Sequence, residues 1–405
     1  MKIYRVGGAV RDHLLHLPVT EVDWVVVGGT AADLIQKGFR PVGRDFPVFL
    51  HPETSEEYAL ARTERKTGPG YGGFACHFDP DVTLEEDLKR RDLTINAMAE
   101  ADDGTLIDPY GGQRDLKLRR LRHVSSAFIE DPLRVLRVAR FAARFWGLGF
   151  QLAAETEDLM RAVVASGEME ALVPERIFKE FERALQTNHP AVFLKVLQSV
   201  GALESLFPEI HGLFGVPQDP RSHPEIDTGV HSLLVLEAAA GLTRDPMIRF
   251  AALVHDLGKG VTDPSEWPRH PHHEALGLPR LEALAQRLRL PKAYQRLAQK
   301  VMACHGQVHK AETLGASELL NLLEALDGFR HPEGVVAVLI ACKADCLGRP
   351  GHEADAYPQG ERVRRALEIA RGVTAARLID QGLEGRAVGE ALQKARIEAL
   401  KAAGF

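Results

Sequence analysis

The sequence has no long apolar run, no internal repeat and no low-complexity segment, and these absences narrow its class. No stretch approaches the ~20 apolar residues of a membrane-spanning helix. Met1 leads directly into strand-like sequence, without the extended apolar segment of a signal peptide. We therefore expect a cytoplasmic protein with no membrane partner.

Cysteine is scarce, and a basic excess is lacking. The four cysteines are Cys76, Cys304, Cys342 and Cys346. The last two form a C-x₃-C pair, but no second pair completes a zinc site, so we expect reduced, partly buried thiols. The net charge of −6 argues against a uniformly basic nucleic-acid binder, so a nucleic acid would have to meet local basic patches.

The composition is that of a globular protein with more than one domain. With 405 residues, 45% hydrophobic and 26% charged, the chain has room for about two to four domains. Short β-like runs predict strands at 24–27, 48–50 and 58–61 and a helix at 31–37, whereas the later pattern is helical. A proline-rich polar stretch at 216–224 predicts a domain boundary. The expected units are an α/β unit, a helical body, a second helical domain and a helical tail, at 1–115, 116–222, 223–350 and 351–405.

Residues 5–24 combine a glycine turn with a pair of acids. Gly7 and Gly8 follow a short apolar strand and precede a predicted helix, whose free N–H groups could face a phosphate chain. Glu21 and Asp23 then open an apolar strand, and side chains two apart in a strand point to one face. Two adjacent carboxylates repel each other unless a cation lies between them, and Mg²⁺ carried by a nucleotide suits oxygen ligands. The alternative is an exposed acidic strand end behind an ordinary glycine turn.

Two later stretches of this unit carry many charges. Residues 62–74 combine charges with Pro69 and several glycines, which predicts a mobile loop or, alternatively, a simple surface hairpin. Arg90 and Arg91 precede a predicted helix or strand that carries Asn96. Their guanidinium groups could clamp phosphates or a ribose, although charge runs usually form solvated faces.

An arginine stripe marks the beginning of the helical region. Arg134, Arg137, Arg140 and Arg144 recur three or four residues apart, near one face of a predicted helix and without partnering acids. Such a stripe could bind a triphosphate or the backbone of a nucleic acid. Asp131 precedes it, at a position where capping of the helix is a complete alternative explanation for an acid.

A second constellation of ionisable residues begins at His231. His255 and Asp256 lie in the segment LVHDLGKG, and Asp345 lies in a later helical segment. Imidazole and carboxylate groups together are good ligands for a divalent metal. Among 17 histidines one His-Asp doublet is expected by chance, but the HDLGKG context favours a site. Spare candidates for a second ion are His272, His273 and His305.

Five segments occur in an order and spacing that resemble a known family. They are GGAVRDHLL, E-x-D-W, RRDLTINAMA, IDPYGG and EDPLRVLRVARF. In this order they resemble the class II tRNA nucleotidyltransferases, which comprise the CCA-adding enzymes and the bacterial poly(A) polymerases. The added HDLGKG segment resembles the bacterial members that carry a C-terminal HD phosphohydrolase domain. The resemblance covers essentially the whole chain.

The resemblance implies an α+β fold, in which a small polymerase β-like nucleotidyltransferase palm with a mixed sheet precedes an all-helical body and a helical HD domain. It implies that Glu21 and Asp23 are catalytic and bind Mg²⁺, although the family more often has aspartate at the first position. It also implies that the glycine-rich loop at 68–73 takes part in the change from C to A addition. The residues that would hold the nucleotide are Gly8, Arg11, Arg91, Asp131, Arg134, Arg137 and Arg140.

Asp131 and Arg134 match the family's protein template for choosing the base. Cytosine and adenine both present an exocyclic amine beside a ring acceptor, whereas uracil and guanine present a carbonyl at the corresponding place. A carboxylate that accepts from the amine and a guanidinium that donates to the ring nitrogen would therefore take C and A and leave U and G unpaired.

For the second domain, the resemblance implies 2′,3′-cyclic phosphodiesterase, 2′-nucleotidase and phosphatase activities with Ni²⁺ or another divalent metal. The implied ligands are His231, His255, Asp256 and Asp345. The implied partners are tRNA, CTP and ATP, and either a monomer or a homodimer is compatible with the sequence. Two alternatives stay open: a poly(A) polymerase of the same family, and an HD phosphohydrolase whose N-terminal unit only binds nucleotide or RNA. The intact acid pair argues against the second.

Overall fold

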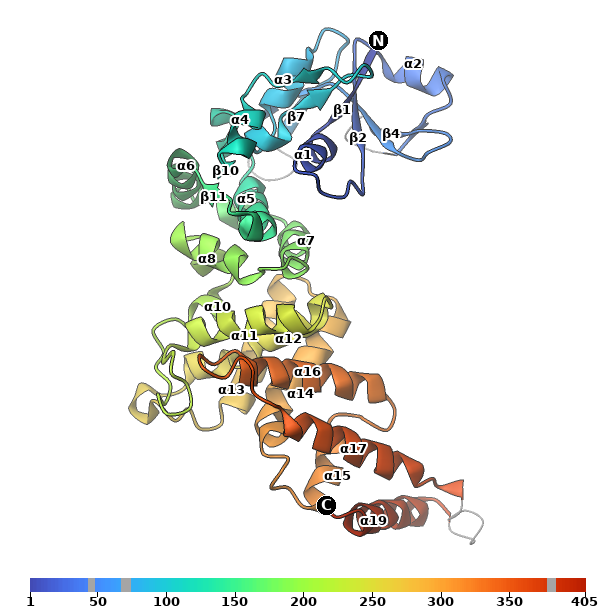
Figure 1. Ribbon diagram of the computed structural model, residues 1–405, viewed down its shortest axis with the longest axis vertical. Coiled ribbons are helices and arrows are strands. Elements are labelled where there is room, and N and C mark those ends of the chain that lie inside the picture. Colours follow the sequence, from blue (N-terminus) through green and yellow to red (C-terminus); the bar gives the residue numbers. More distant parts are fainter. Residues whose placement is uncertain (43–47, 67–73, 377–383) are drawn as a thin grey trace. The chain divides into compact units, whose positions relative to one another are not determined.

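The computed structural model describes residues 1–42, 48–66, 74–376 and 384–405, and the chain divides into two compact units (Figure 1). The first unit comprises Met1–Phe181 and Val192–Leu206. The second comprises Glu182–Ala191 and Phe207–Phe405. No helix within the described ranges is long and apolar enough to cross a membrane.

The first unit is built on a seven-stranded mixed sheet. In spatial order its strands are β3 (Arg40–Pro41), β4 (Val48–Leu50), β5 (Glu57–Leu60), β2 (Asp23–Val27), β1 (Lys2–Val6), β8 (Ala99–Glu100) and β9 (Leu106–Ile107). Only β2 and β5 run parallel to each other, and every other neighbouring pair is antiparallel. The strands predicted at 24–27, 48–50 and 58–61 are thus confirmed as β2, β4 and β5.

Alternation along β2 places apolar side chains on both faces of this sheet. Val25 belongs to a buried cluster that includes Leu84 and Leu88 of α3 (Leu84–Lys89). Val26 belongs to a separate buried cluster that includes Leu34 of α2 (Ala31–Gln36). Because successive side chains of a strand point to opposite faces, one helix covers each side of the sheet. The predicted helix at 31–37 corresponds to α2.

A short hairpin lies in the sequence between β5 and β8. β6 (Thr63–Lys66) and β7 (Phe74–His77) pair in antiparallel fashion, in agreement with the hairpin alternative for residues 62–74. The predicted glycine-rich loop at 68–73 lies outside the described residues.

The rest of the first unit is mostly helical. Its further elements are α1 (Gly8–Leu14), η1 (Thr94–Asn96), α4 (Gly112–Lys117), β10 (Arg120–Leu121), η2 (Ser126–Glu130), α5 (Leu133–Phe145), η3 (Trp146–Leu148), β11 (Gln151–Leu152), α6 (Ala154–Ala165), η4 (Glu168–Ala171), α7 (Pro174–Leu185), α8 (Ala191–Ser199) and α9 (Ala202–Leu206). The last residues of α7 and the first residue of α8 belong to the second unit. The amphipathic helix α5 is the one that carries the arginine stripe, and its apolar residues are buried.

The second unit is helical in its described residues. Its elements are α10 (Pro208–His211), α11 (Thr228–Leu242), α12 (Pro246–Val254), η5 (Leu257–Val261), η6 (Pro264–Glu266), α13 (His273–Arg287), α14 (Lys292–His309), α15 (Ala316–Ala325), α16 (Pro332–Leu347), α17 (Pro358–Gly372) and α19 (Arg386–Ala402). Aspartates begin two of them: the side chain of Asp227 accepts from Val230 N–H at α11, and that of Asp245 accepts from Met247 N–H at α12. The prediction of a mixed sheet followed by helical domains is confirmed. The four cysteines are free thiols, as predicted.

Candidate functional site

The first candidate site lies where β1 and β2 run side by side. Val6, the last residue of β1, pairs with Asp23, the first residue of β2. Gly7 has a φ of 68° and turns the chain into α1. A Cβ atom at Gly7 would lie 2.7 Å from Nη1 of Arg91, so the glycine leaves room for this guanidinium. Arg91 therefore lies where β1 ends, beside the start of β2.

The charges around Asp23 suit a bound cation. Partial desolvation raises the pKa of Asp23, and the negative charge of Glu21 raises it further, while Arg91 and Arg137 act in the opposite direction. Both acids are exposed, so an ion carried by a nucleotide can reach them. A divalent cation between the two carboxylates would remove their repulsion. The residues present therefore fit the predicted metal pair.

Arg11 lies inside the first unit rather than at its surface. It is 2% exposed, donates to the side chains of Asp12 and Asn96, and lies over the rings of Phe141 and Phe145 of α5. Burial lowers the pKa of Arg11, and its bond to Asp12 opposes that effect. In this structure Arg11 joins α1 to α5, and its predicted contact with a nucleotide stays a prediction. Gly8, the other residue predicted there, is the first residue of α1.

The prediction that the arginine stripe lacks partnering acids is wrong. Nε of Arg137 donates to Oδ2 of Asp92 at 2.7 Å. Arg140 is buried and forms an ion pair with Glu180 of α7, and Nη2 of Arg144 donates to Oδ2 of Asp12 at 2.8 Å. The acids come from other elements, so the spacing of residues along one helix could not reveal them. The stripe therefore ties α5 to the sheet domain and to α7.

Asp131 and Arg134 lie at the start of α5, each with partners of its own. Oδ1 of Asp131 accepts from the backbone N–H of Leu133 at 3.0 Å, in agreement with the capping alternative. Its Oδ2 accepts from Nη2 of Arg176 at 3.2 Å. The Nη1 and Nη2 atoms of Arg134 donate at 2.6 Å to the backbone carbonyls of Ala127 and Arg90. The base-reading role of this pair stays a prediction.

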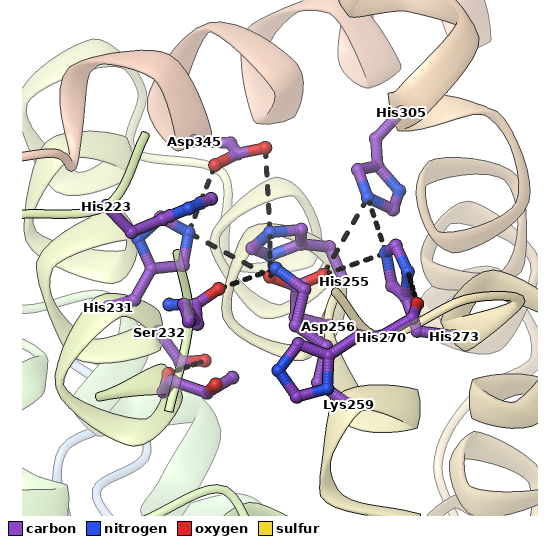
Figure 2. A network of polar contacts seen from close by, with 12 residues as sticks. His223, His231, Ser232, His255, Asp256, Lys259, His270, His273, His305 and Asp345 are labelled. Atoms are coloured by element: carbon purple, nitrogen blue, oxygen red, sulfur yellow. Dashed lines mark hydrogen bonds and ion pairs between the residues drawn. The ribbon is translucent and has the colours of Figure 1, made fainter. Parts of the chain in front are cut away.

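The second candidate site lies in the helical second unit, where side chains from five segments converge (Figure 2). They come from α11, from the two residues after α12, and from α13, α14 and α16. The converging residues are His231, His255, Asp256, His273, His305 and Asp345. Each of them except His273 is buried.

The four ligands predicted for this site do meet. Nε2 of His231 lies 3.1 Å from Oδ1 of Asp345. Nε2 of His255 lies 3.1 Å from Oδ2 of Asp256 and 3.6 Å from Oδ2 of Asp345. Residues up to 114 positions apart in the sequence thus form one cluster of two imidazoles and two carboxylates.

Asp256 also faces a second group of histidines. Its Oδ1 lies 3.3 Å from Nε2 of His273 and 3.7 Å from Nε2 of His305, and the two Nε2 atoms are 3.3 Å apart. The spare candidates His273 and His305 are therefore brought together beside Asp256. His272 is exposed and begins α13 in a left-handed conformation, outside these groups.

The hydrogen bonds on the far side of the rings show that the cluster suits a cation. Nδ1 of His255 faces the carbonyl of Ala252 at 2.8 Å, and Nδ1 of His273 faces that of His270 at 3.0 Å. A carbonyl only accepts, so each Nδ1 carries a proton, and Nε2 is the ring atom that faces Asp256. A lone pair and a carboxylate repel each other unless a proton or a metal ion lies between them. The donor set therefore fits a divalent metal.

Charge keeps both carboxylates of this cluster ionised. Burial raises the pKa of Asp256, but His255 and Lys259 outweigh burial and hold it well below its usual range. Nζ of Lys259 lies 2.6 Å from Oδ2 of Asp256. Burial likewise raises the pKa of Asp345, but the neighbouring histidines, His255 and His309 above all, hold it well below its usual range. Both acids are thus ready to act as metal ligands.

Three further residues that contact this cluster were not predicted from the sequence. Oε1 of Glu225, whose side chain is 2% exposed, lies 2.6 Å from Nδ1 of His231. Nε2 of His309 lies 2.7 Å from Oδ2 of Asp345, and Nδ1 of His309 lies 3.0 Å from the hydroxyl of Tyr357. One signal was available, because His309 follows His305 by four residues and such a pair shares one helix face. Glu225 and Tyr357 carry no comparable spacing.

Three family models match successive parts of the chain. The model described as Poly A polymerase head domain matches residues 3–122. The model described as Probable RNA and SrmB-binding site of polymerase A matches residues 149–213, and the HD domain model matches residues 228–347. The first match contains the acid pair, and the third contains the histidine cluster.

Full-length relatives share more than half of the sequence. A protein of Methylococcus capsulatus named Multifunctional CCA protein is 59% identical over 402 residues, which cover 99% of this chain and 95% of the relative. A protein of the same name from Pseudomonas aeruginosa is 56% identical over 402 residues, which cover 99% of this chain and 98% of the relative.

Solved structures share the fold at lower identity. The Bacillus stearothermophilus CCA-adding enzyme in complex with CTP has a TM-score of 0.66 at 24% identity and covers 99% of this chain and 89% of that one. The Thermotoga maritima CCA-adding enzyme complexed with tRNA has a TM-score of 0.64 at 22% identity and covers 98% and 87%. The predicted fold class is confirmed.

Proposed function

We propose, because this chain belongs to the family of multifunctional CCA proteins, that it adds C, C and A in turn to the 3′ end of tRNA, with CTP and ATP as substrates. The observation that carries this proposal is the acid pair at the start of β2, beside Gly7 and Arg91. The charge environment of Asp23 supports it, since a cation is the missing partner of the two carboxylates. We place this reaction in the cytoplasm.

The residues around the pair divide the work of nucleotidyl transfer. Mg²⁺ held by Glu21 and Asp23 would activate the attacking 3′-hydroxyl and neutralise charge on the α-phosphate. Arg91 lies between Gly7 and the buried Asp87, whose carboxylate fixes the guanidinium at 3.2 Å. A guanidinium in that place binds the triphosphate and stabilises the negative charge that builds on the departing pyrophosphate.

Base selection would use Asp131 and Arg134. Each side chain has hydrogen-bond partners within the protein, and an incoming base would offer groups of the same kind. The exocyclic amine of C or A would donate to the carboxylate, and the ring nitrogen would accept from the guanidinium. U and G would leave buried polar groups unpaired, at a cost of about 1–3 kcal/mol each.

We further propose that the histidine cluster hydrolyses phosphate groups that block tRNA ends, as a 2′,3′-cyclic phosphodiesterase, 2′-nucleotidase and phosphatase. Ni²⁺ or another divalent metal, held by His231, His255, Asp256 and Asp345, would polarise the phosphate and supply a nucleophile from water. A second ion would find Asp256, His273 and His305 as ligands. Lys259, buried beside Asp256, would offer positive charge to the phosphate.

An incorporation assay tests the first activity. The purified chain is incubated with tRNA that lacks CCA and is offered CTP, ATP or both. We expect addition of C with CTP alone and a completed CCA end with both nucleotides. Long runs of A with ATP alone would instead support the poly(A) polymerase alternative, and no incorporation at all would support an HD phosphohydrolase with a nucleotide-binding unit. Glu21→Gln with Asp23→Asn, which removes charge at nearly constant shape, should abolish incorporation.

Hydrolysis of 2′,3′-cyclic AMP tests the second activity. We expect a Ni²⁺-dependent rate that His255→Ala with Asp256→Ala abolishes and that the Glu21→Gln, Asp23→Asn variant retains. A wild-type protein that leaves the cyclic phosphate intact with every divalent metal tried would contradict the hydrolase proposal and leave the first activity standing.

A further inference from the structure

His309 differs from the other histidines of the cluster in its outer partner. His255, His273 and His305 each turn Nδ1 toward a backbone carbonyl, at 2.8, 3.0 and 3.0 Å. Nδ1 of His309 instead lies 3.0 Å from the hydroxyl of Tyr357. A carbonyl only accepts, whereas a hydroxyl can also donate, so His309 is free to hold its proton on the other nitrogen.

The inner partner of His309 decides where that proton lies. Nε2 of His309 is 2.7 Å from Oδ2 of Asp345, and an ionised carboxylate only accepts. Nε2 therefore carries a proton and donates to Asp345, and Nδ1 is the atom that faces the hydroxyl of Tyr357. The hydrogen bonds run in one direction, from Tyr357 through His309 to Asp345. This is the reverse of the arrangement that prepares a histidine to bind a metal through Nε2.

The surroundings of Tyr357 favour its hydroxyl as a hydrogen-bond donor to His309. Its side chain is buried, and it is the residue directly before α17, at the base of the tail. Burial, with the acidic groups nearby, raises the pKa of the Tyr357 hydroxyl far above its usual range. The hydroxyl therefore stays protonated at any pH at which the enzyme works.

We propose that His309 is a positioning residue of the HD site, which holds the Asp345 carboxylate through Oδ2 so that it faces the other predicted ligands, and that Tyr357 fixes the ring of His309 in the donating form. Oδ1 of Asp345 already lies 3.1 Å from Nε2 of the predicted ligand His231. Partners of this kind change metal affinity or activity about 10–100-fold when they are removed. The inference rests on the proposed role of this cluster as a metal site.

The test compares two amides at position 309 in the full chain. Gln places its amide N–H near the position of Nε2, whereas Asn places it near that of Nδ1. Each variant is stripped of metal, and Ni²⁺ binding is measured by calorimetry together with kcat and KM for 2′,3′-cyclic AMP. The His255→Ala, Asp256→Ala double variant lacks two of the predicted ligands, so the Ni²⁺ that it still binds measures binding at other histidines. His331→Gln, at an exposed histidine of the same unit that contacts Glu333, is the matched control.

We expect His309→Asn to weaken Ni²⁺ binding about 10–100-fold, His309→Gln to stay within about threefold of wild type, and His331→Gln to have no effect. Equal losses in His309→Gln and His309→Asn would overturn the proposal, because a direct metal ligand would lose its nitrogen in both. Unchanged binding in both variants would also overturn it. Ni²⁺ affinity tests the role of His309 even if the wild-type protein proves inactive on cyclic phosphate. A wild-type protein that does not bind Ni²⁺ would overturn both the proposed metal site and the positioning role of His309.

A double-mutant cycle separates the role of Tyr357 from a purely structural one. Tyr357→Phe removes only the hydroxyl, so it should weaken Ni²⁺ binding several-fold in the wild-type background and have no effect in the His309→Asn background. Equal effects in both backgrounds would show that Tyr357 acts through packing and would overturn its part of the proposal. CCA addition, which uses the other unit, should be unchanged in every variant and serves as the check on folding.

Discussion

At the scale of single residues, the palm site depends on a backbone turn that glycine forms without strain. Gly7→Ala would force a side chain into a φ of 68° and would place a Cβ 2.7 Å from Nη1 of Arg91. The backbone cost is about 1–2 kcal/mol. Displacement of the guanidinium should lower the rate of CCA addition by about tenfold or more, which corresponds to about 1.4 kcal/mol. Steady-state kinetics with CTP checks this prediction.

Gly104→Ala is the matched control for that change. Gly104 has a φ of 83°, but a Cβ there would meet nothing within 4 Å. It should therefore cost similar stability and leave CCA addition intact. If both variants lost activity equally, general destabilisation rather than the position of Arg91 would explain the result.

Asp92 shows how one buried acid joins the palm to α5. It is 5% exposed and accepts from Arg137, from Asn96 and from the backbone N–H of Leu93. Asp92→Asn would remove the negative charge that faces Arg137. It would also place an amide NH₂ group among the N–H donors that now bond to the carboxylate. We expect a loss of about 2–4 kcal/mol in the free energy of unfolding at pH 7. Urea denaturation measures it, with Asp158→Asn, at an exposed acid, as the control.

The pH dependence of the Asp92 contribution follows from its pKa. Burial raises that pKa, but Arg137 and the hydrogen bonds outweigh burial and hold it far below its usual range. A group with a depressed folded-state pKa stabilises the protein above its unfolded pKa, near 3.9, and loses that contribution as pH falls toward the folded value. The difference between wild type and Asp92→Asn should therefore be constant from pH 7 to about pH 5 and shrink below about pH 4. A difference that grew at low pH would contradict the ion pair.

At the scale of elements, one arginine of α12 joins the C-terminal ends of two other helices, α7 and α11. Arg249 of α12 is 1% exposed and donates to the backbone carbonyls of Leu185, Thr187, Ala240 and Thr243, at 2.5 to 2.9 Å. These carbonyls lie at or beyond the ends of α7 and α11, where helices leave them without partners. Arg249→Met would bury them unsatisfied, and we expect a loss of about 3–5 kcal/mol.

Thermal unfolding of the full chain tests the role of Arg249. Arg249→Lys, with fewer donors, should be intermediate, and Arg244→Met, at a neighbouring exposed position, should be near neutral. If Arg249→Met left the thermal stability unchanged, water or structural relaxation would be satisfying these carbonyls. Arg249 would then not be needed to stabilise the helix ends.

The helices and strands with local apolar patterns could be predicted from the sequence, whereas contacts between distant elements could not. The strands β2, β4 and β5 and the helix α2 follow local apolar patterns, so their positions were predicted closely. His231, His255, Asp256 and Asp345 are of residue types that metals prefer, so they could be proposed from the sequence, and the structure brings them together. Their role as metal ligands stays a prediction. The partners of the arginine stripe were missed because Asp12, Asp92 and Glu180 reach α5 from other elements. Contacts between residues far apart in sequence leave no periodic trace along either segment.

At the scale of the whole molecule, the two predicted metal sites differ in their chemistry, and each would serve one of the two proposed activities. Glu21 and Asp23 offer only oxygen, the ligand type of hard ions such as Mg²⁺. The histidine cluster offers mainly imidazole nitrogen, which favours Ni²⁺ and similar ions. The activities should therefore separate by metal as well as by mutation.

Removal and return of metals tests this separation. After chelation, we expect Mg²⁺ alone to restore CCA addition and not the hydrolysis of 2′,3′-cyclic AMP, which Ni²⁺ should restore. Because metal binding to the folded state stabilises it, Ni²⁺ at 100 times its Kd should stabilise the second unit by about 2.7 kcal/mol. His255→Ala with Asp256→Ala should lose both the hydrolysis and this shift in Tm, and should keep Mg²⁺-dependent CCA addition. Hydrolysis restored by Mg²⁺ alone would contradict the assignment, since nitrogen-rich ligands should bind that ion weakly.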